Sequence, residues 1–276
     1  MIRVRKWGEV TGFLMGRSMG PYVPYTVHAF LVGDTLFDTG AVHARREFMD
    51  ALAGRCITTI VNTHHHEDHI GNNAMIRRVF GAVAYAPEET LPFIADPVRI
   101  GLRLYQRVVW GCPDPSRAAP LGDSIELSDR VFRVIHTPGH SPDHACMLEP
   151  NEGWLFTGDL FCGKTIRYLR RDEDFPLILS SLKRLFPLDF STIFCALKGR
   201  VENGREALGA KIGFMENLQA RVMDLHRKGY PPREIRTRIL GLEGAMHYLS
   251  AAHFSKQHVI DSILAQEDTS PGDALK

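Results

Sequence analysis

The six residues from His64 to His69 carry four imidazoles and two carboxylates, directly after an apolar segment. That segment, 56–61, is rich in β-branched residues, which predicts a strand ending at this cluster. Asn72 or Asn73 can cap a helix over 74–80, so the cluster is expected on a strand-to-helix loop. Zinc, manganese and iron bind imidazole nitrogens and carboxylate oxygens. A histidine-rich surface turn is the simpler interpretation, but such a run need not follow an apolar strand, so the pattern predicts a metal site.

Two further loops carry the same kinds of side chain after predicted strands. The strand-like segment 131–135 runs into Thr137-Pro138-Gly139-His140. The short apolar segment 154–156 ends in Thr157-Gly158-Asp159. Loops held at the ends of strands are where catalytic groups usually collect. We therefore expect His140 and Asp159 to share one site with the histidine cluster, at one edge of a sandwich.

In their order along the chain, these motifs resemble those of the metallo-β-lactamase superfamily of metallohydrolases. Four ordered motifs between roughly residues 25 and 200 are too specific for a chance match. The resemblance implies an α/β fold, a four-layer αββα sandwich with the metal site along one edge of its two sheets. The matching elements are Asp38-Thr39-Gly40, His64-x-His66-x-Asp68-His69, Thr137-Pro138-Gly139-His140 and Thr157-Gly158-Asp159.

The resemblance also implies a role for each of these side chains. We expect two divalent ions, zinc first, with manganese or iron as alternatives. A bound cation lowers the pKa of its water to about 7, which provides a metal-bound hydroxide at neutral pH. Asp68 would be the catalytic residue that orients this hydroxide and passes a proton to the leaving group. The implied ligands are His64, His66 and His140 for the first metal, Asp68 and His69 for the second, and Asp159 as the bridge.

One position departs from the family pattern. The family usually has a last histidine in a Gly-His-Gly-like turn near the end of the core, and Lys198 stands in its place here. An ammonium has no lone pair for a metal, so three hypotheses follow. The site is mononuclear and Lys198 binds an anionic substrate group, or a weakened second site is held by Asp68, His69 and Asp159 alone, or a C-terminal histidine fills the gap. Lys198 is equally compatible with an ordinary exposed loop lysine.

Composition indicates a soluble globular protein and narrows the choice of partners. The 276 residues are 44% hydrophobic, enough for a large core, and the net charge of +1 gives no general attraction to nucleic acid or membranes. No secretory signal and no apolar run long enough to cross a bilayer is visible. Cys56, Cys146 and Cys195 lie in apolar stretches and are expected to be buried thiols. We therefore expect a cytoplasmic protein.

The chain is predicted to hold one αββα domain, residues 1–204, followed by an all-helical appendage, residues 205–267. Residues 268–276 are expected to be a disordered tail. Ser255 is a suitable N-cap for the last helix. Apolar residues at helical spacing predict appendage helices over about 205–228, 233–240 and 255–266.

Two groups of basic residues have a functional and a plain interpretation. A helix expected over 96–110 carries arginines at 99, 103 and 107 on one face, which either meets the substrate or faces solvent; we favour solvent. Further basic residues follow the Asp159 loop closely, and we expect at least one of them to face the pocket. These are Lys164, Arg167, Arg170 and Arg171.

The appendage has three interpretations. It can fold over the edge of the sandwich that carries the expected metal site and shape the pocket, with His247 or His253 reaching inward. His253 is then a candidate for substrate binding, as Lys198 is. The segment 229–235 can instead open a helix-turn-helix, but few arginines and a near-neutral chain argue against that. The third interpretation is packing scaffold. We expect a small-molecule substrate, anionic if Lys198 binds it, no nucleic-acid or membrane partner, and consider a homodimer.

These features predict a metal-dependent hydrolase that uses a metal-bound hydroxide on a small ester, thioester, lactone or phosphoester. The alternative enzyme is a mononuclear-iron persulfide dioxygenase, because a weakened second site suits one metal. A non-catalytic ligand-binding member of the fold is the third hypothesis. The intact ligand set argues against it, because a binding module need not keep an open metal site.

Replacing one expected ligand tests the assignment. We expect His66→Ala to lose bound metal, because the change removes an imidazole from the first site. Lys198→Ala should keep at least one metal per chain and mainly change substrate affinity. Elemental analysis of the purified proteins measures both results. Full metal content and turnover in His66→Ala would contradict the assignment.

Overall fold

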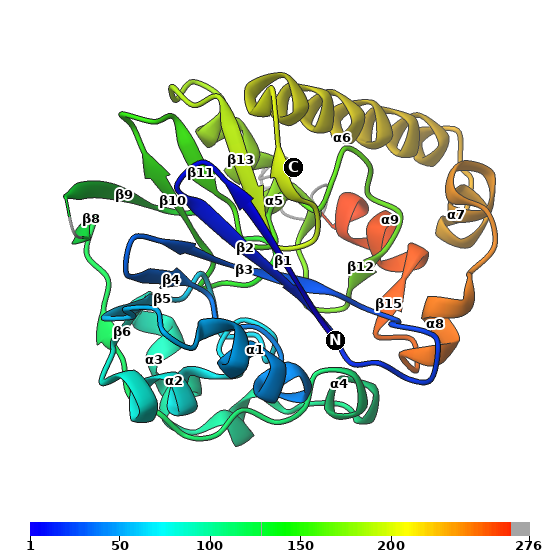
Figure 1. Cartoon of the computed structure of the whole chain (residues 1–276). Helices are drawn as coiled ribbons and strands as arrows, with labels where there is room; N and C mark the ends of the chain where they lie inside the picture. The colour runs from blue at the N-terminus through cyan, green and yellow to red at the C-terminus, as the bar shows by residue number, and fades with distance from the viewer. Residues whose placement is uncertain (128, 266–276) are drawn as a thin grey trace.

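Two β-sheets lie face to face in the computed structural model, which describes residues 1–127 and 129–265 (Figure 1). The first sheet has the strand order β1 (Ile2–Trp7), β2 (Val10–Met15), β3 (Val27–Val32), β4 (Thr35–Phe37), β5 (Thr59–Val61), β6 (Val83–Ala86) and β7 (Ala119–Pro120). The second has the order β14 (Gly199–Val201), β13 (Thr192–Cys195), β11 (Trp154–Phe156), β10 (Ala145–Glu149), β9 (Arg130–His136) and β8 (Ser124–Leu127). Strands β1 to β4 pair antiparallel, whereas β4 to β7 pair parallel and so need crossover connections.

Helices cover the outer face of each sheet and complete the four layers (Figure 1). The 3-10 turn η1 (Val42–Ala44) leads into α1 (Arg45–Leu52), and η2 (Glu88–Thr90) leads into α3. The predicted αββα sandwich is confirmed. The helices on the first sheet are α1, α2 (Asn73–Phe80) and α3 (Leu91–Ala95), and those on the second are α5 (Phe175–Leu185) and α6 (Gly204–Arg227).

A column of aromatic rings fills the space between the two sheets. Phe156 of β11 stacks on Phe37 of β4, with ring centroids 4.2 Å apart and planes 12° apart. It also stacks on Phe194 of β13, at 4.9 Å and 19°. All three side chains are buried. Because each ring belongs to a strand that ends at the same edge, this packing sets where the loops at that edge begin.

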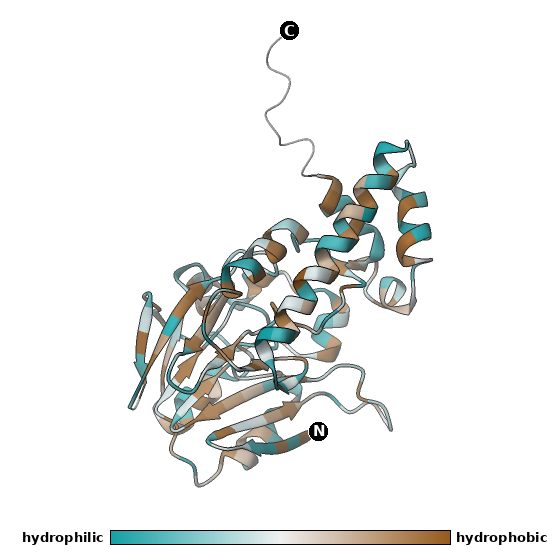
Figure 2. Cartoon of the chain, turned by 90° about the horizontal axis from the view of Figure 1, so that it is seen from above, coloured by the Kyte–Doolittle hydropathy of each residue, from teal (hydrophilic) through white to brown (hydrophobic). Residues whose placement is uncertain are grey.

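The C-terminal segment packs beside the second sheet. In Figure 2 the long helix α6 alternates hydrophilic and hydrophobic residues along its length, and its inward side joins the core behind α5. The Ser255 cap is confirmed, since its side chain accepts a hydrogen bond of 2.9 Å from the Gln257 amide. The segment is not all helical, because β15 (Phe254–Ser255) pairs with β12 (Leu169–Arg170). Its other helices are α7 (Pro232–Leu240), α8 (Ala245–Leu249) and α9 (Lys256–Leu264).

The single helix predicted over 96–110 is wrong. The structure has the 3-10 helix η3 (Pro97–Ile100) and the helix α4 (Leu104–Val109), which are separated at Gly101, whose φ of +66° ends the first turn. Cys146 and Cys195 are buried, but Cys56 is exposed because the strand begins only at Thr59. The tail predicted to be disordered lies outside the described residues. Within those residues, no helix is both long and apolar enough to span a membrane.

Phe156→Ala tests the aromatic column. Removing a buried ring that contacts two others should lower the free energy of unfolding by about 3–5 kcal/mol. Chemical denaturation measures the change. Val131→Ala on β9 is the control, because Val131 is 49% exposed and its truncation should cost less than about 1 kcal/mol. Equal losses in the two variants would mean that the column does not hold the sheets together.

Candidate metal centre

The six side chains implied as ligands converge at the edge of the sandwich where the strands end. The loop after β5 carries four of them, the β9–β10 loop carries His140, and the loop after β11 carries Asp159. All are buried except Asp159, which is half-buried. The structure therefore brings together His64, His66, Asp68, His69, His140 and Asp159, as the sequence predicted, while their role as ligands stays a prediction.

Four of these side chains form a tight cluster. His66 Nδ1 lies 2.6 Å from His64 Nε2 and 3.0 Å from His140 Nε2. Asp159 Oδ2 lies 3.3 Å from His140 Nε2. The four candidate ligand atoms all lie within 4.8 Å of one another. Three imidazoles and one carboxylate at these distances are a donor set that suits a single divalent ion.

A second group of candidate ligands adjoins the first. His69 Nε2 lies 3.6 Å from Asp159 Oδ1 and 4.0 Å from Asp68 Oδ1. Both His69 Nε2 and Asp159 Oδ1 are buried without a hydrogen-bond partner among the described residues. Buried polar atoms are rarely left unpaired, and a cation between them would satisfy both. Asp159 faces both groups, which fits a bridging carboxylate.

Carboxylates behind the site orient its imidazoles. His69 Nδ1 donates to Asp38 Oδ2 over 2.7 Å, and His140 Nδ1 donates to Glu173 Oε1 over 2.6 Å. With Nδ1 engaged, the Nε2 lone pair of each ring is directed into the site. Asp38 also accepts from the Thr63 amide and hydroxyl, at 2.8 and 2.9 Å. It has a φ of +59°, in the left-handed region, so the turn that carries it is strained.

Close backbone packing holds the ligand loop in place. A Cβ atom at Gly71 would lie 2.3 Å from the Gly40 carbonyl oxygen, so only glycine fits where the loop crosses the Asp-Thr-Gly turn. Asp143 ties the same loop to the β9–β10 loop: it accepts from the His65 amide and ring, each at 2.9 Å, and from the Thr90 hydroxyl at 2.6 Å. The position of His140 relative to His64 and His66 therefore depends on Asp143.

Burial and charge set opposite protonation preferences within the site. Burial, with neighbouring positive groups, lowers the pKa of His64 and of His66 well below the usual value, which keeps their lone pairs free. Burial alone would lower the pKa of His69, but nearby carboxylates outweigh it and raise that pKa. Burial raises the pKa of Asp68 to about 7. For Asp159 burial acts the same way, but His69 and His140 outweigh it and lower the pKa.

Arg170 is the basic residue after the Asp159 loop that reaches the cluster. It is buried at the end of β12, and its guanidinium donates to His66 Nδ1 over 2.8 Å. The same group lies 3.4 Å from His140 Nε2. A metal ion held by His66 Nδ1 and this hydrogen bond would compete for the same lone pair. Arg167 is exposed but also lines the main cavity, whereas Lys164 and Arg171 are exposed and do not line it.

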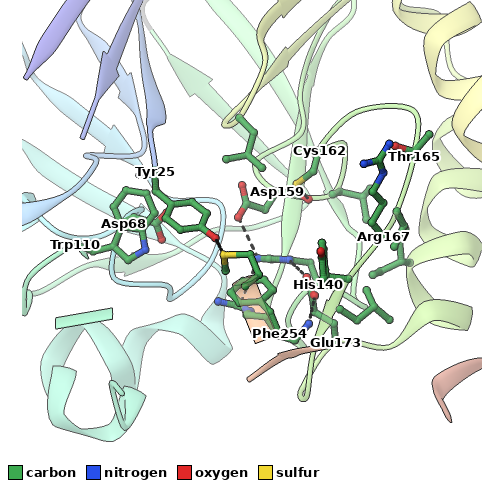
Figure 3. A pocket seen from close by; sticks show the side chains of 18 of the residues that line it. Tyr25, Asp68, Trp110, His140, Asp159, Cys162, Thr165, Arg167, Glu173 and Phe254 are labelled. Atoms are coloured by element: carbon green, nitrogen blue, oxygen red, sulfur yellow. Dashed lines mark hydrogen bonds and ion pairs between the residues drawn. The ribbon is translucent and has the colours of Figure 1, made fainter. Parts of the chain in front are cut away.

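A cavity of about 370 Å³ opens beside the cluster (Figure 3). Asp68, His140 and Asp159 line it on one side, while the rest of its wall is mainly apolar. Lys198 is exposed on the turn between β13 and β14, and its neighbour Leu197 lines the cavity instead. The cavity wall also includes Met246 of α8, so the C-terminal segment helps to enclose it. Other apolar or aromatic lining residues are Tyr25, Trp110, Ile166, Ile178 and Phe254.

His253 reaches inward, and His247 does not. The Tyr105 hydroxyl lies 2.7 Å from His253 Nδ1, and His253 Nε2 lies 3.4 Å from Asp172 Oδ1. His253 lines a smaller cavity of about 260 Å³, together with His66 and Arg170. His247 faces Glu243, at 3.7 Å, and neither histidine belongs to the cluster of ligand atoms. Within the described residues, neither His247 nor His253 therefore supplies the last histidine of the family pattern.

Sequence reasoning missed two residues of the site. Glu173, which orients His140, has no motif around it and is brought near by the turn after β12. Lys211 of α6 lines the main cavity although it is 1% exposed. One signal could have identified it: Lys211 falls at helical spacing among Leu208, Ile212 and Met215, where an apolar residue is expected.

Comparisons with known proteins agree with this geometry. Residues 23–196 match the family model described as the metallo-beta-lactamase superfamily. A hydroxyacylglutathione hydrolase of Maricaulis maris is 36% identical over 162 residues, which are 56% of this chain and 54% of that enzyme. One of the same name from Nostoc punctiforme is 32% identical over 195 residues, 68% of each chain. The chain thus spans between about half and two thirds of these relatives.

A solved structure shows the same fold over nearly the whole chain. A metallo-beta-lactamase family protein of Thermus thermophilus superposes with a TM-score of 0.68, over 93% of this chain and 94% of that one. The two share 23% sequence identity, so the likeness concerns the fold alone. It includes the C-terminal segment, which the family model does not reach.

Asp143→Asn tests the hydrogen bonds by which the Asp143 carboxylate joins the β9–β10 loop to the loop after β5. Burial alone would raise the pKa of Asp143, but the hydrogen bonds from His65 and Thr90 outweigh it and hold that pKa well below its usual range. The charged carboxylate therefore stabilises the fold above the unfolded-state pKa of about 3.9, and this contribution is lost as the pH falls below it. We expect the variant to lose about 1–3 kcal/mol at pH 7.

Urea denaturation across pH checks this expectation. The difference in the free energy of unfolding between wild type and Asp143→Asn should stay constant from pH 5 to pH 7 and become smaller below about pH 4. Glu126→Gln on the exposed side of β8 is the control, and its free energy of unfolding should match that of wild type across this pH range. If the difference in the free energy of unfolding became larger in acid, the stabilising role of the Asp143 charge would be refuted.

Proposed function

Because the chain belongs to the metallo-β-lactamase superfamily, we propose that it is a metal-dependent hydrolase of a small acyl substrate, with a thioester as the first candidate. The observation that carries the proposal is the cluster of His64, His66, His140 and Asp159, whose ligand atoms lie within 4.8 Å of one another on a cavity wall. The relatives named hydroxyacylglutathione hydrolase support the choice of substrate class, since an acyl group on the glutathione sulfur is a thioester.

Each residue of the site has a part in this proposal. His64, His66, His140 and Asp159 would hold a first divalent ion, and Asp68, His69 and Asp159 a second. When bound, such ions lower the pKa of a coordinated water to about 7 and polarise the acyl oxygen. Asp68 would accept a proton from the attacking water and return it to the leaving sulfur. Glu173 and Asp38 keep His140 and His69 in the orientation that this requires.

The shape and lining of the cavity favour an acyl chain. Ile166, Ile178 and Phe254 form part of its wall, so an extended apolar group gains free energy by leaving water there. Tyr25 and Trp110 add aromatic surface to the wall and lie beside Asp68 in Figure 3. A water-filled channel for a polyanionic substrate would need a polar lining instead. The proposed substrate is therefore a small molecule with an apolar part next to the scissile bond.

One observation favours a second candidate, the mononuclear-iron dioxygenase. Within the described residues, the turn between β13 and β14 offers Leu197 to the cavity and no imidazole, so the second group of ligands has only Asp68, His69 and the shared Asp159. A single bound metal would suit that donor set. The metal content and the reaction catalysed distinguish the two candidates.

Metal analysis combined with a thioester assay tests the proposal. We expect two equivalents of zinc or manganese per chain and hydrolysis of acyl thioesters that stops when a chelator removes the metal. Asp68→Asn should lower kcat by about 10²–10⁴ through loss of its proton transfer, while keeping the first metal. Glu89→Gln, exposed at η2, is the control and should leave kcat unchanged.

Two results would contradict the proposal. One iron per chain, with oxygen consumed on addition of a persulfide, would establish the dioxygenase. Full turnover by Asp68→Asn would remove Asp68 from its catalytic role even if the protein were a hydrolase.

A further inference from the structure

Lys211 is a cation placed where α6 otherwise buries apolar side chains. Leu208, Ile212 and Met215 on the same face are all buried in the core behind α5. Lys211 is buried with them and is only 1% exposed. Lysine is almost never fully buried unless its ammonium is paired. Its position therefore calls for a partner.

The described residues provide only one hydrogen-bond acceptor for the Lys211 ammonium. Lys211 Nζ donates one long hydrogen bond, 3.3 Å, to the Gly163 carbonyl oxygen, and lies 5.6 Å from the centre of the Phe161 ring. No carboxylate of the described chain lies within the 4.0 Å of an ion pair with it. An ammonium has three donors, so two are left without a protein acceptor. Burial accordingly lowers the pKa of Lys211.

The space next to this ammonium is the cavity of the metal centre. Lys211 lines the same cavity of about 370 Å³ as Asp68, His140 and Asp159. Glu173 and Asp159 line it too and raise the pKa of Lys211 through space, but neither lies within the 4.0 Å of an ion pair with the ammonium. A ligand in the cavity can therefore reach both the metal centre and Lys211.

We propose that Lys211 binds a carboxylate of the substrate, so that the preferred substrates are acyl compounds carrying a second, free carboxylate. The inference rests on the proposed hydrolase function. A carboxylate matches the site because one ammonium balances one negative charge. A phosphate dianion would leave an uncompensated charge in a mostly apolar pocket. Two arginines line the same cavity, but the Arg170 guanidinium is engaged by His66 at 2.8 Å and by Asp172 at 3.8 Å, and Arg167 is exposed to solvent.

Pairing of the Lys211 ammonium with a substrate carboxylate gives selectivity for substrates that carry this group, as well as affinity. A substrate without the carboxylate leaves the buried ammonium unpaired, and that loss raises the free energy of its complex. Buried polar groups built to bind a charged substrate group discriminate strongly against analogues that lack it. Lys211, and not the exposed Lys198, then has the anion-binding role that the sequence suggested for a lysine of this region.

Two isosteric thioesters test the inference. S-glutaryl-N-acetylcysteamine ends in a carboxylate, and the 5-methylhexanoyl thioester ends in two methyl groups of the same shape. We expect the metal-loaded wild type to prefer the glutaryl compound by about tenfold or more in kcat/KM. Lys211→Met should abolish the preference, mainly through KM. Lys228→Met, on the exposed end of the same helix, is the matched control and should retain it.

A binding measurement separates this inference from the proposed function. Calorimetry with glutaramate, which has one carboxylate and one amide, is run on wild type and Lys211→Met after removal of metal by a chelator. We expect binding to wild type and a loss of about tenfold or more in the variant. This result without any thioester hydrolysis would overturn the function and keep the Lys211 site. Hydrolysis of both thioesters alike, with glutaramate binding unchanged in Lys211→Met, would overturn the Lys211 site alone.

Folding of the variant does not limit the test. Methionine has a similar length and no charge, so Lys211→Met should fold, and a circular dichroism spectrum checks this. Should it not fold, equal turnover of the two thioesters by wild type would by itself overturn the inference.

Discussion

The Asp38 carboxylate is the contact on which the rest of the site depends. It accepts from the amide and hydroxyl of Thr63 and from the ring of His69, and so joins the turn after β4 to both ends of the ligand loop. The left-handed backbone at Asp38 costs free energy, and three hydrogen bonds to one buried carboxylate offset it. Because β4 and β5 pair in parallel, the loops that follow these two strands begin side by side.

The electrostatic design of the site separates histidines that stay neutral from those that pair with acids. Burial, with neighbouring positive groups, lowers the pKa of His64 and of His66, which favours the neutral form of both rings. His69 and His140 face acids on two sides, Asp38 and Asp159 for the first and Glu173 and Asp159 for the second. Nearby carboxylates raise the pKa of His69, so a cation bound there would replace a proton on that ring, which links metal binding to proton release.

Much of the candidate site could be predicted from the sequence, because its side chains come from short motifs directly after strands. The αββα layers were implied by the resemblance of these motifs to those of the metallo-β-lactamase superfamily. What could not be predicted depends on contacts between distant segments. Arg170 reaches His66 only because β12 pairs with β15, a strand of two residues without a sequence signal. Lys198 was an expected anion-binding residue, but its turn places Leu197 inward, and the buried lysine is Lys211.

The order in which the cavity wall appears along the chain has a consequence for biosynthesis. All six candidate ligands precede residue 160, whereas Lys211, Met246 and Phe254 complete the wall much later. Domains generally fold as units during synthesis, those nearer the N-terminus first. The ligand loops leave the ribosome before the residues that close the cavity wall. The pocket becomes selective only when the last helices of the chain have been made and have docked.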